Sequence, residues 1–114
     1  MPSLGMDGPY DFSSDAVDRV VTLTKAGNFA LGTTDTKGVF IVNYVGRSDG
    51  DVKTELKSKP AGTTHQKFKF SYADSSKEAF EKECRNYHDF RPPENAIHPD
   101  RPSGTSYQCP VPHQ

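Results

Sequence analysis

The segment KFKFSY, residues 67–72, constrains the fold of this chain more than any other stretch of the sequence. Its aromatic and polar side chains alternate strictly, with Phe68, Phe70 and Tyr72 set between Lys67, Lys69 and Ser71. Because successive side chains of a β-strand point to opposite faces, this alternation predicts a strand that buries its aromatic face and exposes its lysines. Such a strand needs neighbouring strands and a layer that covers its apolar face, so we expect a layered fold that contains a sheet.

Two more strands are predicted upstream, in GNFALGTTD at residues 27–35 and in KGVFIVNYVG at residues 37–46. A polar turn, TTDTK, joins them. The second segment is almost continuously apolar from Val39 to Val45, which is typical of a central strand buried on both faces. The three strands are therefore expected to form one small antiparallel sheet.

Along the chain, helices are predicted before, between and after these strands. Apolar residues recur at helical spacing in residues 13–27, although the valines there leave a strand possible. A short polar helix is expected in residues 52–56, and a capping box of Ser75 and Glu78 begins a longer helix that Pro92 ends. The order helix, strand, strand, helix, strand, helix predicts an α/β (α+β) fold, with a three-stranded antiparallel sheet flanked by helices.

The rest of the chain is expected to add little to the core. Residues 1–12 suggest a flexible leader, residues 13–95 one domain, and residues 96–114 an irregular proline-rich tail packed on or trailing that domain. No apolar run reaches the roughly 18 residues of a membrane helix, and the first residues lack the pattern of a secretory signal. Two cysteines are too few for a secreted disulfide scaffold. We therefore expect a cytoplasmic monomer.

Two short motifs resemble those of the GIY-YIG nuclease superfamily, which carries two tyrosine-glycine triplets on adjacent strands. YVG, Tyr44 to Gly46, resembles the second triplet, and Arg47 takes the basic position that follows it. GNF, residues 27–29, is the candidate for the first triplet. This resemblance implies an antiparallel sheet flanked by helices, in agreement with the predicted order of elements.

The resemblance extends to the end of the predicted domain and covers roughly residues 26–95. Glu83 matches the family's metal-binding glutamate, and Asn95 matches an asparagine in a proline-containing segment that follows it. Two positions depart from the family pattern. Phe29 stands where a tyrosine is usual, and Glu55 falls near the position of an arginine on the helix after the second triplet. The expected fold survives these changes, whereas full catalytic competence does not follow.

The resemblance implies a phosphodiester-cleaving site in which Tyr44, Arg47, Glu83 and Asn95 line one shallow hollow. A tyrosine hydroxyl has a pKa near 10 and needs a neighbouring cation, here Arg47, to lower it. Glu83 would hold one Mg²⁺ or Mn²⁺ ion that stabilises the leaving oxygen, and Asn95 would orient a phosphate oxygen or a water. We expect a metal-dependent endonuclease or a weakened relative; the alternative is a catalytically inactive nucleic-acid- or protein-binding module that retains the fold.

A nucleic-acid partner, DNA rather than RNA, would need a local patch of positive charge. The net charge of −1 and the pI of about 6.4 exclude a general polyanion binder. Residues 44–70 contain six basic residues and three acidic ones. The basic residues are Arg47, Lys53, Lys57, Lys59, Lys67 and Lys69, and the acidic ones are Asp49, Asp51 and Glu55. Sequence specificity would then come from a protein partner or from the structure of the substrate.

Two motifs, Cys84-x₃-His88 and Cys109-x₃-His113, form a second candidate site. Two cysteines and two histidines would satisfy a tetrahedral zinc ion, and helical spacing places Cys84 and His88 on one face. The spacing is not that of the usual zinc motifs, and Cys84 also suits the buried stripe of its helix. We therefore expect a buried thiol at Cys84, with zinc and a Cys84–Cys109 disulfide as alternatives.

Overall fold

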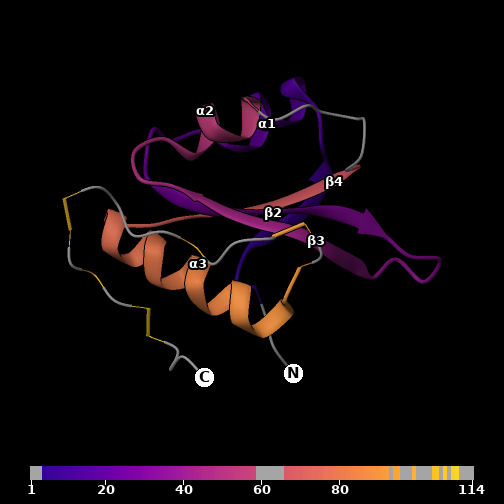
Figure 1. The fold of residues 1–114 in the computed structure, drawn as a ribbon. Helices are drawn as coiled ribbons and strands as arrows, with labels where there is room; N and C mark the ends of the chain where they lie inside the picture. The colour runs from indigo at the N-terminus through magenta and orange to yellow at the C-terminus, as the bar shows by residue number, and fades with distance from the viewer. Residues whose placement is uncertain are drawn as a thin grey trace.

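A computed structural model describes residues 4–58, 66–92, 94–95, 99, 104–105, 107 and 109–110 of the chain. The strands are β1 (Asp7–Asp11), β2 (Gly27–Thr34), β3 (Phe40–Ser48) and β4 (Lys67–Tyr72), and the helices are α1 (Ser14–Val20), α2 (Val52–Lys57) and α3 (Ser76–Phe90). The strands form one antiparallel sheet in the order β1-β4-β2-β3. Helices α1 and α2 cover one face of this sheet and α3 covers the other (Figure 1). The predicted mixed α/β class is confirmed.

The sheet has four strands rather than the expected three, because residues 7–11 of the expected leader form β1. This strand lies at the edge of the sheet and pairs antiparallel with β4. Its register shifts between Asp7 and Tyr10, around Pro9. Proline is tolerated at a sheet edge, where part of the backbone hydrogen bonding faces away from the neighbouring strand. Gly8 and Pro9 interrupt the alternation of apolar and polar residues in this strand, so the sequence pattern did not predict it.

Strand β3 is the other edge of the sheet, and the prediction of a central strand there is wrong. Val39 and Ile41, both inside the apolar run, are exposed. The pairing with β2 shifts at Asn43, so that Val42 and Val45 both pack on the side of α3. A bulge of this kind breaks the alternation along a strand. The continuous apolar run is therefore explained by a bulge in an edge strand, and not by burial of the strand on both faces.

The aromatic face of β4 lies where the alternation predicts. Phe68 and Phe70 are buried in a hydrophobic cluster between the sheet and helices α1 and α2. We call this cluster the main core; its buried members are Phe12, Ala16, Val17, Val21, Phe29, Leu31, Val52, Leu56, Phe68 and Phe70. A smaller core on the opposite face contains Leu4, Ala30 and Val45, with Tyr87 and Phe90 of α3 packed against it.

The helix caps follow the sequence signals closely. The Ser75 hydroxyl oxygen accepts a hydrogen bond from the Glu78 amide over 3.2 Å and so caps α3, as predicted. The helix ends at Phe90, ahead of Pro92, with Arg91 in the left-handed region at φ 42°. Helix α1 ends at Val20, several residues before the predicted limit. Among the described residues, none of the helices has the length and apolarity to cross a membrane.

Candidate functional site

The two triplets recognised in the sequence lie side by side on β2 and β3. In the antiparallel register Asn28 is opposite Arg47, and Phe29 is opposite Gly46. A Cβ atom added at Gly46 would come within 2.5 Å of Cζ of Phe29. Because real Cβ atoms do not approach so closely, the Phe29 ring requires glycine at position 46.

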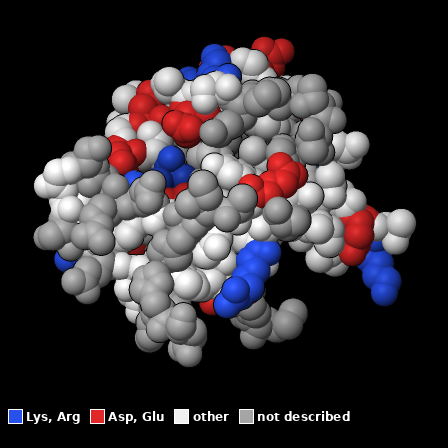
Figure 2. Space-filling model, in the orientation of Figure 1, with Lys and Arg blue, Asp and Glu red and all other residues white. Residues whose placement is uncertain are grey.

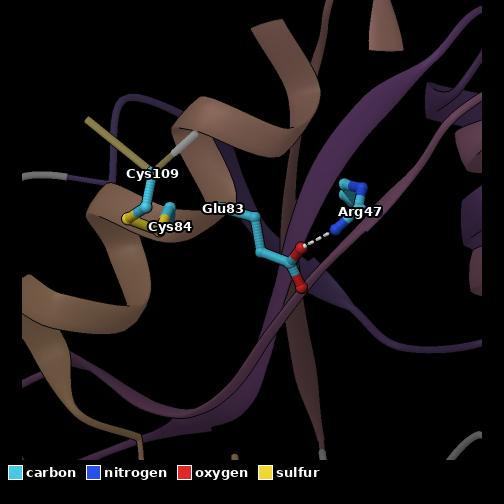
Figure 3. Close-up of a disulfide and its surroundings, with 4 residues drawn as sticks. All are labelled: Arg47, Glu83, Cys84 and Cys109. Atoms are coloured by element: carbon cyan, nitrogen blue, oxygen red, sulfur yellow. Dashed lines mark hydrogen bonds and ion pairs between the residues drawn. A yellow bond between two sulfur atoms is a disulfide. The ribbon is translucent and has the colours of Figure 1, made fainter. Parts of the chain in front are cut away.

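The carboxylate of Glu83 is held by Arg47. Nη1 of Arg47 donates a hydrogen bond to Oε1 of Glu83 over 2.6 Å, and Nε donates to Oδ1 of Asp49 over 2.9 Å. Only 13% of the Arg47 side chain and 10% of the Glu83 side chain are exposed. Figure 3 shows Glu83 directed from α3 toward Arg47 on β3. The pair therefore joins the helix to the edge strand beneath it.

The arginine remains charged in this setting. Burial of the guanidinium opposes its charge, but hydrogen bonds to Asp49 and Glu83 outweigh burial and raise the pKa of Arg47. The guanidinium carbon also lies 5.2 Å from the centre of the Phe80 ring, a distance that suits a cation–π contact. The contact with Glu83 is thus a charge-assisted hydrogen bond in a largely buried position.

Glu83 does not fit the magnesium site that the resemblance implies. Mg²⁺ takes a near-octahedral shell of oxygen atoms from carboxylates, water or substrate phosphates. The guanidinium of Arg47 lies between Glu83 and Asp49 and bonds to an oxygen of each. A divalent cation at Glu83 would lie next to this positive charge, and Arg47 already bonds to one of the two carboxylate oxygens, so the geometry gives the carboxylate a partner other than a metal.

Tyr44 lies on the opposite face of the sheet from this ion pair. Positions 44 and 47 are an odd number of residues apart, so a regular strand points them to opposite faces. Tyr44 packs against the main core, and its ring centre lies 6.1 Å from that of Phe29. Glu83 projects from α3, which covers the other face. The structure therefore does not bring the phenol to the hollow expected for Arg47 and Glu83.

Asn95 is used to close part of the free edge of β3. Its Oδ1 accepts a hydrogen bond from the Val45 amide over 2.8 Å, and its Nδ2 donates to the Val45 carbonyl over 2.9 Å. The Glu94 amide donates to the Asn43 carbonyl over 3.0 Å. These contacts imitate a neighbouring strand, and both ends of the Asn95 amide are engaged by backbone.

Two of the lysines predicted to bind nucleic acid belong to α2. Nζ of Lys53 lies 3.3 Å and Nζ of Lys57 2.8 Å from Oδ1 of Asp18 on α1. The hydrogen bond from Lys57 is the main reason why the pKa of Asp18 is lowered. The two lysines therefore share one carboxylate above the main core.

The other two lysines lie on the opposite face of the sheet. Lys67 and Lys69 alternate with the phenylalanines of the main core, so they point toward the side covered by α3. Lys67 pairs with Asp11, and Nζ of Lys69 lies 5.4 Å from the centre of the Phe40 ring. On the face drawn in Figure 2, Lys and Arg are scattered among Asp and Glu. The described cations thus form separate groups, and Lys59 lies outside the described residues.

A polar row crosses the α3 face of the sheet, and the sequence pattern did not single it out. Arg47, Asn28 and Ser71 stand opposite one another on β3, β2 and β4. Asn28 is fully buried, and its Nδ2 donates to the Ala79 carbonyl over 2.8 Å. A polar residue inside the apolar stretch GNFAL was the available signal, because such a residue must find hydrogen bonds once it is buried.

The polar row continues into a cavity of about 260 Å³ at the start of α3. Asn28, Lys82 and Arg85 are among the residues that line it. Lys82 donates to the Ser71 hydroxyl over 2.8 Å and to the Gly5 carbonyl over 2.6 Å. Burial, aided by the nearby charge of Arg85, lowers the pKa of Lys82. The lysine therefore ties the first described residues to α3 as well as lining the cavity.

The second candidate site contains a disulfide between Cys84 and Cys109, whose Cα atoms are 5.8 Å apart. The prediction of a free thiol is wrong, because the tail brings Cys109 back to α3. His88 lies beside the two sulfurs, and the three possible ligand atoms are all within 4.8 Å of one another. His113, the fourth residue of the predicted zinc set, lies outside the described residues.

The structure thus brings Arg47 and Glu83 together, places Asn95 on the backbone next to them, and puts Tyr44 behind the sheet. This arrangement can anchor a helix to an edge strand and hold a chain segment along that edge. No family model, curated protein or solved structure matches the chain.

Proposed function

We propose that this protein is a catalytically inactive binding module with a GIY-YIG-like fold. The observation that carries the proposal is the ion pair between Arg47 and Glu83, whose charged groups are 2.6 Å apart and largely buried. Phosphodiester cleavage needs a base whose accepting atom lies within about 2.6–3.2 Å of the oxygen that loses its proton, and positive charge at the same phosphate. Tyr44, the expected source of that chemistry, packs in the main core behind the sheet.

The departures in sequence support the same proposal. Phe29 lacks the hydroxyl that the first triplet usually supplies, and its ring packs on Gly46 instead. Glu55, near the family's arginine position, brings a negative charge to α2. Both changes are compatible with the fold and remove groups that the reaction would use.

A protein partner fits the described surface better than a nucleic acid does. The lysines divide between two faces of the sheet, and Lys53, Lys57 and Lys67 each contact a carboxylate. By contrast, Val39, directly before the edge strand β3, and Ile41, near its beginning, are two residues apart, with 55% and 44% of their surface exposed. An extended peptide can add a strand to such an edge, with alternate apolar side chains supplying specificity.

Two experiments test the two parts of the proposal. Purified protein is incubated with structured and single-stranded DNA and RNA in the presence of Mg²⁺ or Mn²⁺, beside the Glu83→Ala variant. We expect no products above those of the variant, and no salt-sensitive retention of either nucleic acid. Affinity capture then compares wild type with Ile41→Lys, which should lose its protein partner. The matched control is Leu23→Lys, because Leu23 is 49% exposed and lies outside the edge strand.

The nuclease is the second candidate, and one observation favours it. Arg47 and Glu83 are 36 residues apart in sequence, and yet they meet as two adjacent members of the predicted site. Metal-dependent cleavage by wild type that disappears in both Glu83→Gln and Tyr44→Phe would establish this candidate and overturn the first. Salt-sensitive binding without cleavage would keep the inactive module but make nucleic acid its partner.

A further inference from the structure

Three side chains of types that can ligate a metal, Cys84, His88 and Cys109, lie close together where Cys109 meets α3. Cys84 and His88 are one helical turn apart on α3, and Cys109 follows 25 residues after Cys84. Their two sulfurs and an imidazole nitrogen all lie within 4.8 Å of one another.

We propose that Cys84, His88 and Cys109 bind one zinc ion when the disulfide is reduced. Thiolate and imidazole are preferred ligands of Zn²⁺, with Zn–S near 2.3 Å and Zn–N near 2.0–2.1 Å. Two thiolates on a tetrahedral zinc ion therefore lie about 3.8 Å apart. The two sulfurs, bonded to each other in the disulfide, would separate to this distance once the S–S bond opens, and the imidazole nitrogen of His88 already lies within 4.8 Å of both. Water completes the fourth position.

The disulfide and the zinc site are alternative states of the same sulfurs. A dithiol reductant converts the disulfide to two thiols and becomes a disulfide itself. Zinc then displaces one proton from each thiol, while His88 binds as a neutral imidazole, so two protons are released for each ion bound. A small-molecule disulfide reverses this exchange by thiol–disulfide exchange: it accepts two electrons from the two thiolates and becomes two thiols, while the Cys84–Cys109 bond forms again and the metal is released. A reducing compartment therefore favours the zinc form.

The surroundings suit this ion and keep it apart from the ion pair. Cys84 is fully buried, while His88 and Cys109 are partly exposed, so an ion can reach the cluster from the solvent side. In Figure 3 Glu83 and Cys84 are consecutive on α3 but point in different directions, toward Arg47 and toward Cys109. The soft sulfur ligands select zinc over magnesium. The bound ion would hold the segment at Cys109 against α3, as the disulfide does.

The test compares the two redox states of the wild-type chain. One sample is treated with a dithiol and then freed of it without oxygen, and a parallel sample is kept oxidised. Zinc is titrated into each in competition with a chromogenic chelator. We expect one zinc ion per chain in the reduced sample, and affinity at least about a hundredfold lower in the oxidised one, which has no thiolate. Equal binding by the two samples, or no binding by the reduced one, would overturn the proposal.

Variants then identify the ligands. His88→Ala and Cys109→Ser, at partly exposed positions, should each weaken zinc binding at least about tenfold. The matched control is Asp89→Ala, which changes an exposed neighbour of His88 on the same helix and should leave the affinity unchanged. With Co²⁺ as a spectroscopic substitute, the thiolate-to-metal absorption band should weaken in Cys109→Ser. A His88→Ala variant that binds zinc as tightly as wild type would exclude the proposed site.

Discussion

The ion pair between Arg47 and Glu83 leads to a quantitative prediction about stability. Glu83→Ala leaves the Arg47 side chain, of which 13% is exposed, still paired with the carboxylate of Asp49. Removing one member of a buried pair costs about 3–5 kcal/mol. Because Asp49 is itself 41% exposed and still accepts from Nε, we expect Glu83→Ala to lower the free energy of unfolding by about 2–4 kcal/mol.

A double variant separates the value of the pair from the cost of breaking it. Arg47→Met keeps an apolar stem near Phe80, and Glu83→Leu fills the place of the carboxylate. Replacing both charges by apolar side chains is often neutral or stabilising. The double variant should therefore be more stable than Glu83→Ala by at least about 1–2 kcal/mol.

Urea denaturation followed by circular dichroism provides the free energies of unfolding. Asp89→Ala removes an exposed carboxylate from the same helix and should stay within about 0.5 kcal/mol of wild type. The reasoning is refuted if Glu83→Ala loses no more than this control. It is also refuted if the double variant is less stable than Glu83→Ala, since an uncompensated buried charge would then not be the cause of the loss.

Three further predictions concern packing, capping and charge. Gly46→Ala should lower the free energy of unfolding by about 1–3 kcal/mol, because its methyl group would overlap the Phe29 ring; in urea denaturation, adding Phe29→Leu should recover part of the loss, and no recovery would contradict the packing argument. Ser75→Ala should cost about 1 kcal/mol through loss of the α3 cap, and an unchanged urea midpoint would count against it. The hydrogen bond from Lys57 lowers the pKa of Asp18 from its ordinary value of 3.8, so this carboxylate stabilises the fold above pH 3.8 and ceases to do so as the pH falls through its folded-state pKa. The stability difference between wild type and Asp18→Asn should therefore vanish in strong acid, and a difference that persists there would refute the sign.

Local signals in the sequence predicted local structure well. The alternation in residues 67–72 identified both the strand and its buried face, and Ser75 marked the beginning of α3. These signals depend only on neighbours within a few positions, so they do not require knowledge of how distant segments of the chain pack. Strand β1 escaped detection because Pro9 and its neighbouring glycine remove the alternation at an irregular sheet edge.

The candidate site was predictable only in part. Arg47 and Glu83 were chosen from sequence and lie in contact, whereas Tyr44 is on the other face. The spacing of 44 and 47 already implied opposite faces for a regular strand, and that signal was available. The positions of Asn95 and Cys109 depend on the path of the segments after α3, for which no local pattern exists.

The sheet separates the phenol of Tyr44 from the ion pair of Arg47 and Glu83. Nuclear Overhauser contacts in solution test this separation, because they report proton pairs only a few ångströms apart. We expect contacts between the ring protons of Tyr44 and those of Phe29, whose ring centres are 6.1 Å apart, and none between the Tyr44 ring and the side chain of Glu83. Contacts from the Tyr44 ring to the Glu83 side chain would contradict the claim and return the phenol to a shared site.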